Sequence, residues 1–535
     1  MAYSYSGVAY NETGFFSRLV TDYLEGNANL NEFYSYTPDA EGIEKAINAR
    51  SFHSTDRVLL VKVLTAQYDG RATTSTVLDN IQSLLSNTTY TITTAHQPNL
   101  MTGYLYFVYK ILHVIKLAEG LNEKYPNKHF VPVYYMGSED NDIDELGVFR
   151  YGNEKFVWDG DGQSGAVGRM STARLKPLLE RLFVTMGPPG SHYTELRELI
   201  TEAYMGQPTI GAATHYLVDK LFGKYGLVIV NPDNAALKSA FIPVIKDELL
   251  HGKSYTIVSE QTKLLELNYK TQAFPRPINL FYLDNQTRER IERVGERWVV
   301  LNTNITFSEA DLLLEVESHP EKFSPNVILR GLFQSTILPD VAFIGGGAEV
   351  AYWFQLRSLF AHYNVFYPVV MLRQSVLWID AQQARLRQQS GLNIHDIFIK
   401  ESDLVKNYIA AHSKDDWHTT KESMDIALIL DGLRSKAQTV DATLLASANA
   451  VLHRIQKQLA VLEQKMYRAE KKKMSIQVQR ISKLKQAIFP SNSLQERTCN
   501  FVEYYLLYGA RFFDIIKEGI QPLKNTLLIV EDSVD

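Results

Sequence analysis

A polar loop with a histidine follows the β-branched run Tyr90–Thr94 and precedes an apolar helical stretch that begins near Tyr104. Because a helix N-terminus presents unpaired N–H groups and a partial positive charge, such a loop suits an anion or a phosphate. His96 could neutralise developing charge or move a proton, although it could also serve only to satisfy backbone groups in a tight loop. The candidate residues here are His96 as a catalytic group, with Gln97, Thr102, Gly103 and Lys110 as binding groups.

An acidic cluster follows the next strand-like run, Phe130–Met136. Its five carboxylates lie within the seven residues from 139 to 145 and repel one another, so they need cations, amines or water nearby. We expect them to bind an amino group, with Mg²⁺ less favoured and no metal site assigned. The alternative is an exposed loop whose aspartates cap a helix. The candidate catalytic residues are Glu139, Asp140 and Asp142.

Two further segments carry polar groups that could line a pocket. Ser324 is expected to cap a helix with Pro325 at its first position, after which Asn326, Arg330 and Gln334 recur every four residues. An arginine flanked by amides on one face can grip a carboxylate, although a polar outer stripe gives the same pattern.

The glycine run that follows Val341–Ile344 would let the backbone approach a ligand closely. It precedes a helix expected over Val350–Tyr363. It is neither a Walker A loop nor a Gly-x-Gly-x-x-Gly fingerprint. The candidate binding residues in and near this turn are Gly345, Gly346, Glu349, Gln355 and Arg373.

Alternating strand-like runs and amphipathic stretches position these clusters, which predicts an α/β fold with a mostly parallel sheet. Several runs end in polar or glycine-rich residues, and ligands of open α/β sheets collect beyond the carboxyl ends of strands. The expected strands are Tyr90–Thr94, Phe130–Met136, Gly226–Val230, Ile278–Leu283, Val341–Ile344 and Phe366–Leu372.

From about Ala381 the pattern changes to long helices. Apolar residues alternate three and four apart from Leu452 to Ala469, which is typical of a coiled-coil seam, and the spacing slips near Lys471–Lys473. The seam serves either dimerisation or a helical hairpin within one chain. We therefore divide the chain into a core (1–380), a helical domain (381–490) and a C-terminal segment (491–535) that folds back on the core.

The composition excludes several function classes. Lysine and arginine number 55 against 60 acidic residues, and this net charge of −5 gives no sign of a nucleic-acid or membrane surface. No apolar run approaches a bilayer-spanning length, and the first ten residues lack a signal-peptide pattern. A cytoplasmic location is expected. The single cysteine, Cys499, precludes an internal disulfide and is expected to be a structural thiol.

Taken together, the motifs resemble the bacillithiol biosynthesis cysteine-adding enzyme family, BshC, with the first motif most similar to its Bacteroidetes branch. The matches run in order along nearly the whole chain. They include Thr94-Ala95-His96-Gln97, Pro132-Val133-Tyr134, Ser138-Glu139-Asp140, Gly165-Ala166-Val167-Gly168, Ser324-Pro325-Asn326-Val327, Ala342-Phe343-Ile344-Gly345-Gly346 and Leu494-Gln495-Glu496-Arg497.

The resemblance implies a Rossmann-like core with inserted connecting segments, similar to nucleotidyltransferases and class I aminoacyl-tRNA synthetases, and a coiled-coil domain that forms homodimers. It implies a ligase that joins the carboxyl group of L-cysteine to the amino group of glucosaminyl-malate, giving bacillithiol. The sequence demands no cofactor, although ATP or ADP is the candidate activating ligand. The family's acidic motif has a histidine where this chain has Asn141, which cannot take up a proton near neutral pH.

Within this interpretation, the loop at His96 holds an activating phosphate and the acidic cluster binds an amine. Asn326 and Arg330 hold a carboxylate beside the glycine turn. The alternatives are a non-catalytic dimeric scaffold that binds a nucleotide or a thiol metabolite, and a nucleotidyltransferase that acts on another substrate.

Overall fold

The computed structural model describes residues 3–284, 286–414 and 416–533. The chain divides into two compact units. The larger contains Tyr3–Trp378 and Ser493–Val530, and the smaller consists mainly of Ile379–Asn492. The segment that follows residue 492 therefore supplies most of its residues to the larger unit.

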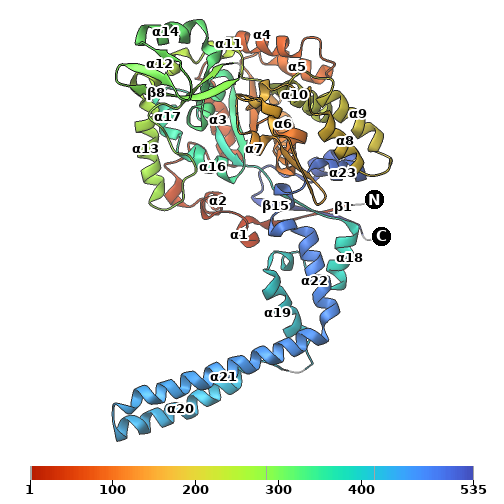
Figure 1. The fold of residues 1–535 in the computed structure, drawn as a ribbon, viewed down its shortest axis with the longest axis vertical. Helices are drawn as coiled ribbons and strands as arrows, with labels where there is room; N and C mark the ends of the chain where they lie inside the picture. Colours follow the sequence, from red (N-terminus) through yellow and green to blue (C-terminus); the bar gives the residue numbers. More distant parts are fainter. Residues whose placement is uncertain (1–2, 285, 415, 534–535) are drawn as a thin grey trace. The chain divides into compact units, whose positions relative to one another are not determined.

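A five-stranded parallel sheet with the strand order β13-β12-β2-β3-β6 forms the centre of the larger unit (Figure 1). Nearly every residue of these strands is buried, as expected for a parallel sheet covered on both faces. The predicted α/β class and five of the six expected strands are confirmed here. The strands are β2 (Thr89–His96), β3 (His129–Met136), β6 (Val228–Val230), β12 (Asp340–Gly345) and β13 (Val369–Leu372).

Helices α3 (Ala40–Arg50) and α6 (Leu105–Lys124) bury apolar side chains against this sheet. Ile47 of α3 and Val114 of α6 share one core cluster with Ile92, Val341 and Met371 of the strands. Burial of each such side chain contributes about 1.5–3 kcal/mol. This packing fixes the strand ends, where the polar residues lie.

The sixth expected strand lies in a different sheet. The run Ile278–Leu283 contains β7 (Leu280–Asp284), which pairs antiparallel in a second sheet with the order β10-β9-β8-β7-β11. Apolar content alone does not distinguish a parallel from an antiparallel neighbour, because the partner strand is chosen by tertiary packing. Its other strands are β8 (Thr287–Val294), β9 (Arg297–Val300), β10 (Thr306–Phe307) and β11 (Phe323–Pro325).

Two smaller sheets complete the strands. One joins β4 (Val148–Tyr151) to β5 (Glu154–Val157). The other contains, in spatial order, β1 (Tyr3–Ala9), β15 (Thr526–Asp532) and β14 (Val376–Ile379). The other helices of the larger unit are α1 (Tyr10–Thr13), α2 (Arg18–Leu24), α4 (Arg57–Tyr68), α5 (Ser75–Ser83), α7 (Ile143–Leu146), α8 (Lys176–Thr185), α9 (Tyr193–Tyr204), α10 (Ile210–Phe222), α11 (Ala235–Ser239), α12 (Ile242–His251), α13 (Lys253–Glu266), α14 (Glu309–Ser318), α15 (Val327–Ile337), α16 (Gly347–Phe354), α17 (Arg357–His362), α23 (Phe501–Tyr508) and α24 (Arg511–Gly519).

Two expected helix boundaries were wrong. Ser324 does not cap a helix, because Ser324 and Pro325 belong to β11 and the cap of α15 is Asn326, whose side chain accepts from the Ile328 N–H at 2.8 Å. The helix expected over Val350–Tyr363 is two helices, α16 and α17, separated near Gln355. In both places a polar side chain hydrogen-bonds to a residue that is distant in the sequence: Asn326 to Asn279, and Gln355 to Ala273.

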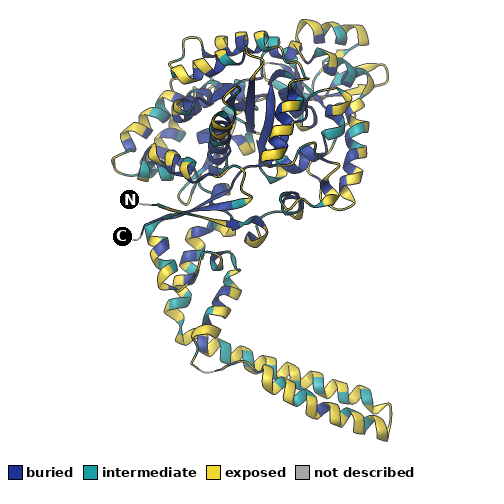
Figure 2. Cartoon of the chain, turned by 180° about the vertical axis from the view of Figure 1, so that it is seen from behind, coloured by how far each residue is buried: buried dark blue, intermediate teal, exposed yellow. Residues whose placement is uncertain are grey.

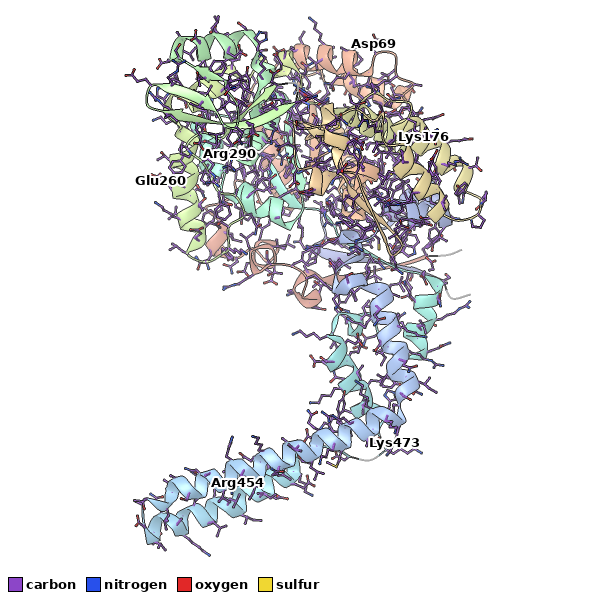
Figure 3. All side chains as sticks on the ribbon, viewed as in Figure 1. Asp69, Lys176, Glu260, Arg290, Arg454 and Lys473 are labelled. Carbon is purple, nitrogen blue, oxygen red and sulfur yellow. The ribbon has the colours of Figure 1, made fainter. Side chains whose placement is uncertain are left out.

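The smaller unit is helical, with α18 (Ala381–Gln389), α19 (Glu401–His412), α20 (Thr420–Val440), α21 (Leu444–Lys473) and α22 (Ser475–Ile488). Helices α20 and α21 form an antiparallel hairpin, and the slip expected near Lys471–Lys473 falls where α21 ends. Most of its residues are exposed, and charged side chains such as Arg454 project from it (Figures 2 and 3). In the described part of the chain, no helix combines the length and apolar character needed to cross a membrane.

Candidate active site

A cavity of about 550 Å³ lies at the carboxyl-end edge of the parallel sheet. There β2 ends at His96, directly beside Met136 at the end of β3, and Gly345 ends β12. Polar groups that the sequence places far apart are thereby brought together. The predicted residues that border the cavity are His96, Gln97, Lys110, Glu139, Asp140, Asn326, Arg330, Gly346, Glu349 and Arg373.

Three cationic side chains converge on one wall of this cavity. Lys110 is ion-paired with Glu349 and donates to the Ala95 carbonyl at 3.1 Å. Arg373 makes two hydrogen bonds, of 2.6 and 2.7 Å, with the carboxylate of Glu496. These two cations are therefore already neutralised by protein carboxylates.

Arg330 differs from its two neighbours. Its guanidinium donates to the phenol oxygen of Tyr352, and within the described residues it forms no ion pair with a carboxylate. Burial raises the pKa of Tyr352 to about 12, so this phenol remains neutral and does not offset the arginine charge; the carboxylates of Glu349 and Asp140 raise the pKa of the guanidinium without forming an ion pair with it. Such a guanidinium, partly shielded from water, is the strongest binding group for an incoming carboxylate or phosphate.

His96 lies beside this cationic wall. Its Nδ1 is 3.5 Å from the Lys110 ammonium, and its buried Nε2 has no hydrogen-bond partner among the described residues. Burial, followed by the positive charges of Lys110 and Arg330, holds the pKa of the imidazole well below its usual range. The ring is therefore neutral at physiological pH; because the Lys110 ammonium can only donate, Nδ1 faces it as the acceptor, and Nε2 carries the ring proton as a donor without a partner among the described residues.

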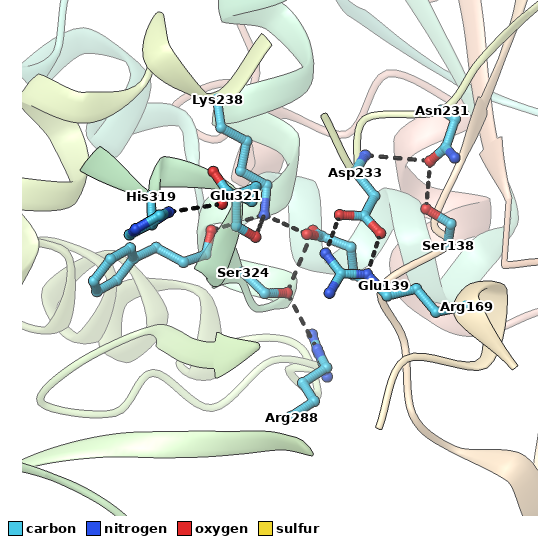
Figure 4. Close-up of polar contacts among 11 residues, drawn as sticks. Ser138, Glu139, Arg169, Asn231, Asp233, Lys238, Arg288, His319, Glu321 and Ser324 are labelled. Atoms are coloured by element: carbon cyan, nitrogen blue, oxygen red, sulfur yellow. Dashed lines mark hydrogen bonds and ion pairs between the residues drawn. The ribbon is translucent and has the colours of Figure 1, made fainter. Parts of the chain in front are cut away.

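The cavity lining also includes a member of a buried ion pair that the sequence did not predict (Figure 4). Glu139 pairs with the ammonium of Lys238 from α11, which also donates to the Phe323 carbonyl at 2.8 Å. Ser324 donates to the second Glu139 oxygen at 3.3 Å and accepts from Arg288 Nε at 3.1 Å. Glu139 therefore already has a cationic partner, whereas the sequence interpretation kept it for a substrate amine.

The Asp140 side chain is more exposed than that of Glu139, at 33% against 8%. It accepts from Gln97 Nε2 at 3.0 Å, and its nearest guanidinium, that of Arg288, is 3.9 Å away. Its charge is therefore less completely balanced than that of Glu139. Of the predicted acidic residues, Asp140 is the one best placed to bind an amine.

Comparisons with known proteins define the family. A model described as "Bacillithiol biosynthesis BshC, N-terminal Rossmann-like domain" matches residues 3–374. A second, "Bacillithiol biosynthesis BshC, C-terminal coiled-coil domain", matches residues 376–531. The chain belongs to the BshC family. The resemblance drawn from the motifs is confirmed.

Curated relatives named "Putative cysteine ligase BshC" match along the full chain. The protein from Flavobacterium johnsoniae is 38% identical and the match covers 98% of this chain and 99% of that protein. The relative from Cytophaga hutchinsonii is 35% identical, with 97% and 98% covered. Both are Bacteroidetes members, as the first motif indicated. A methionyl-tRNA synthetase from Mycobacterium tuberculosis, solved in complex with methionyl-adenylate, matches at 9% identity over 81% of this chain and 92% of that chain, but its TM-score of 0.21 supports no argument.

Several of the predicted site residues do not border the cavity. Asp142 is exposed and caps α7 through the Glu145 N–H at 3.2 Å, which is the helix-capping alternative noted above. Thr102 and Gly103 are buried in the loop before α6, with positive φ angles of 62° and 68°. Asn500 donates to the Met101 and Gly103 carbonyls and so holds this loop in shape.

The predicted residues Gln334, Gly345 and Gln355 are also structural. Gln334 donates to Asp340 at 3.3 Å inside the core. Gln355 accepts from the Ala273 N–H at 2.9 Å and donates to the Ala273 carbonyl at 2.8 Å. The carbonyl of Gly345 accepts from the Arg373 N–H at 2.8 Å. The four-residue spacing does put Gln334 on the same face as Arg330, but one turn further along α15, where the side chain lies inside the core.

The N-terminus of α6 borders the cavity through Tyr104 and Tyr106, but one of its N–H groups is already used. The Leu105 N–H donates to the Cys499 carbonyl at 3.0 Å. The first turn of α16 borders the cavity as well, through Gly346 and Gly347. Burial raises the pKa of the Cys499 thiol to about 12, which agrees with a structural role for this residue.

Sequence reasoning missed the partners that tune the site. Lys238, Arg288, Glu496 and Arg497 were not predicted as site residues. Of these, Glu496 and Arg497 lie in a motif that matched the BshC family, which was the only available signal. In the described residues no group of three or more histidine, cysteine or acidic side chains is arranged to hold a metal ion.

Asn141, which replaces the family histidine, is held by Arg288. Its Oδ1 accepts from Arg288 Nη1 at 3.0 Å, and its Nδ2 donates to the Arg288 carbonyl at 3.3 Å. Since an amide does not titrate near neutral pH, it orients Arg288 without supplying a base. His96 is thus the neutral imidazole on the cavity wall.

Proposed function

We propose that this chain is a cysteine ligase, which joins the carboxyl group of L-cysteine to the amino group of glucosaminyl-malate and forms bacillithiol in the cytoplasm. Arg330 is the observation that carries the proposal. It presents an unbalanced guanidinium to a cavity of about 550 Å³, which is large enough for small metabolites. The malate portion of the acceptor substrate would supply the carboxylates that Arg330 binds.

Amide formation from a free carboxylate in water requires activation, and ATP is the proposed activating cosubstrate. The cysteine carboxylate attacks a phosphorus atom of ATP, which gives an acyl-adenylate and pyrophosphate or an acyl-phosphate and ADP. The amine of the sugar then attacks the acyl carbon and expels AMP or phosphate, and its proton passes to a base. The proposal assigns the ammonium form before attack, and the released proton, to Asp140, and it assigns the Nε2–H of neutral His96 to the negative charge that develops on the acyl oxygen.

A single-turnover assay of bacillithiol formation tests this assignment. Purified full-length protein is incubated with cysteine, glucosaminyl-malate and ATP, and Arg330→Met is compared with Arg290→Met, which alters an exposed arginine on β8. Loss of one charge-assisted hydrogen bond, worth about 1.5–3 kcal/mol, should lower kcat/KM roughly 10- to 150-fold in Arg330→Met only. A kcat/KM near the wild-type value in Arg330→Met would contradict the assignment of Arg330 as a substrate-binding residue.

Nucleotide turnover tests the activation step separately. AMP or ADP should accumulate in step with bacillithiol and only when cysteine is present. Exchange between ATP and pyrophosphate without cysteine would favour the alternative of a nucleotidyltransferase with another substrate. Binding of cysteine, glucosaminyl-malate or ATP without conversion of any of them would favour the alternative of a non-catalytic scaffold.

We further propose that the chain forms a homodimer through its helical hairpin. Leu428, Ile429 and Leu433 of α20 are largely exposed, although the opposite side of the helix packs on α21. An exposed apolar stripe of this kind is typical of an interface. The intrachain hairpin and a dimer are therefore compatible, rather than alternatives.

A further inference from the structure

A second cavity of about 390 Å³ lies at the carboxyl ends of β3 and β6 and shares no lining residue with the first. It is bordered by Met136, which ends β3, by Asn231, which follows β6, and by the first turn of α10. A hydrogen bond of 2.6 Å from Ser138 to Asn231 lies in the wall between the cavities. It lies at the same edge of the sheet, where open α/β folds collect ligands.

His215 of α10 borders this cavity in an unusual state. Its side chain is 3% exposed, and both ring nitrogens are buried without a hydrogen-bond partner among the described residues. Burial and the charge of Arg71 lower the pKa of the ring to about 3, so it is neutral, with one nitrogen that donates and one that accepts. Leaving both without a partner costs free energy that a bound polar molecule would recover.

The surrounding groups define the charge of that molecule. Helix α10 has thirteen residues, and Thr209, Gly211 and Ala212 at its N-terminus line the cavity. Arg71 donates through Nε to the Gln67 carbonyl at 2.8 Å, and in the described part of the chain its guanidinium forms no ion pair with a carboxylate. Two of the first three N–H groups of α10 are already used, by the Met170 carbonyl and the Thr209 hydroxyl, so the remaining Gly211 N–H and the Arg71 guanidinium are the groups that favour an oxyanion.

The remaining polar groups indicate what else the ligand carries. Asp69, on the outer surface after α4, lies at the rim of the cavity (Figure 3). Its carboxylate can only accept hydrogen bonds, and one of the two ring nitrogens of neutral His215 is likewise an acceptor. The complementary molecule therefore has a carboxylate or phosphate together with a hydroxyl or amino group.

We propose that this cavity is a second ligand site, in which Arg71, the N-terminus of α10 and His215 bind a small hydroxylated or amino-bearing oxyanion. The site goes beyond the proposed ligase reaction, because none of its residues borders the first cavity. It needs neither cysteine nor ATP. The site recognises the oxyanion of its ligand, which is either a carboxylate or a phosphate.

Calorimetry on the full-length chain tests the site with two probes, malate and glycerol phosphate, at an ionic strength fixed with potassium chloride. The starting protein carries Arg330→Met, so that the unbalanced cation of the first cavity is absent. At least one probe should bind, and the further change Arg71→Met should weaken its Kd roughly tenfold or more. Arg71→Lys, which keeps the charge, should recover part of the affinity, and the preferred probe separates carboxylate from phosphate.

Histidine ¹⁵N spectra provide a second measurement that does not require a variant of the buried ring. The His215 resonances should shift on addition of the bound probe and stay unshifted in Arg71→Met. The proposal is overturned if neither probe binds at millimolar concentration, or if affinity is unchanged by Arg71→Met. Because the ligase assay is read independently, failure here leaves the proposed reaction standing.

Discussion

The ammonium of Lys238 is ion-paired with the Glu139 carboxylate, and neither side chain is appreciably exposed. The pair joins α11 to the loop after β3, and Lys238 also reaches the carbonyl of Phe323 in the second sheet. One buried cation thus connects the parallel core to the antiparallel insertion at the wall of the cavity. Removal of either charge would leave the other buried and unbalanced.

Lys238→Met should therefore destabilise the protein by about 3–5 kcal/mol at neutral pH. Burial already raises the pKa of Glu139, and loss of Lys238 raises it further. Since a raised folded pKa means that stability is present at low pH and lost as pH rises, the deficit should shrink on acidification toward pH 5. Urea denaturation at several pH values measures this. The double variant Lys238→Met with Glu139→Gln should be more stable at neutral pH than Lys238→Met alone. If both variants lose the same free energy of unfolding relative to wild type, the pairing is contradicted.

His96 should remain neutral through the physiological range. Burial and the charges of Lys110 and Arg330 lower its pKa well below the usual value. Because the folded pKa is depressed, the contribution of this ring to stability is present above the unfolded pKa of about 6.5 and lost as pH falls. Histidine ¹⁵N spectra should show no His96 titration between about pH 6 and 8. In Arg330→Met its pKa should rise, and an unchanged value there would refute the electrostatic cause.

Gly103→Ala should reduce stability by about 1–3 kcal/mol, because this residue has a φ of 68° with a ψ of −118°, a conformation that favours glycine. An added Cβ would also lie 3.1 Å from the Asn99 Cβ. Gly120→Ala is the matched control, since its Cβ would meet no atom within 4 Å and helix α6 favours alanine. In thermal denaturation, the Tm of Gly103→Ala should lie below that of wild type, and the Tm of Gly120→Ala should equal or exceed it. The reverse order would exclude a purely conformational role.

Leu428→Glu combined with Leu433→Glu should convert a dimer to a monomer. These side chains are 72% and 51% exposed on α20, so the charges are tolerated in the isolated chain but not in an apolar interface. Sedimentation should give a mass near 60.9 kDa for this variant and about twice that for wild type. Gln438→Glu, which adds a charge elsewhere on the exposed surface of α20, should stay dimeric. A monomeric wild type would exclude the interface.

The sequence by itself determined the strands that carry the site and the polar residues at their ends. The runs that became β2, β3 and β12 are locally apolar and β-branched, and His96, Glu139 and Gly346 follow within a few residues. Parallel strands then place those ends at one edge, whatever the details of packing. The break at Lys473 was likewise visible as a change in apolar spacing.

Only the tertiary structure decided which charges are balanced. Lys238 meets Glu139 across 99 positions of the chain, and Glu496 meets Arg373 across 123. No local period marks such pairs, because their partners are selected by packing between distant elements. The same holds for Gln355, which was a candidate because it lies near the glycine turn but whose amide is used by the Ala273 backbone. Arg330 was predicted from its sequence, but its availability for a ligand follows from the absence of a carboxylate partner among the described residues around it.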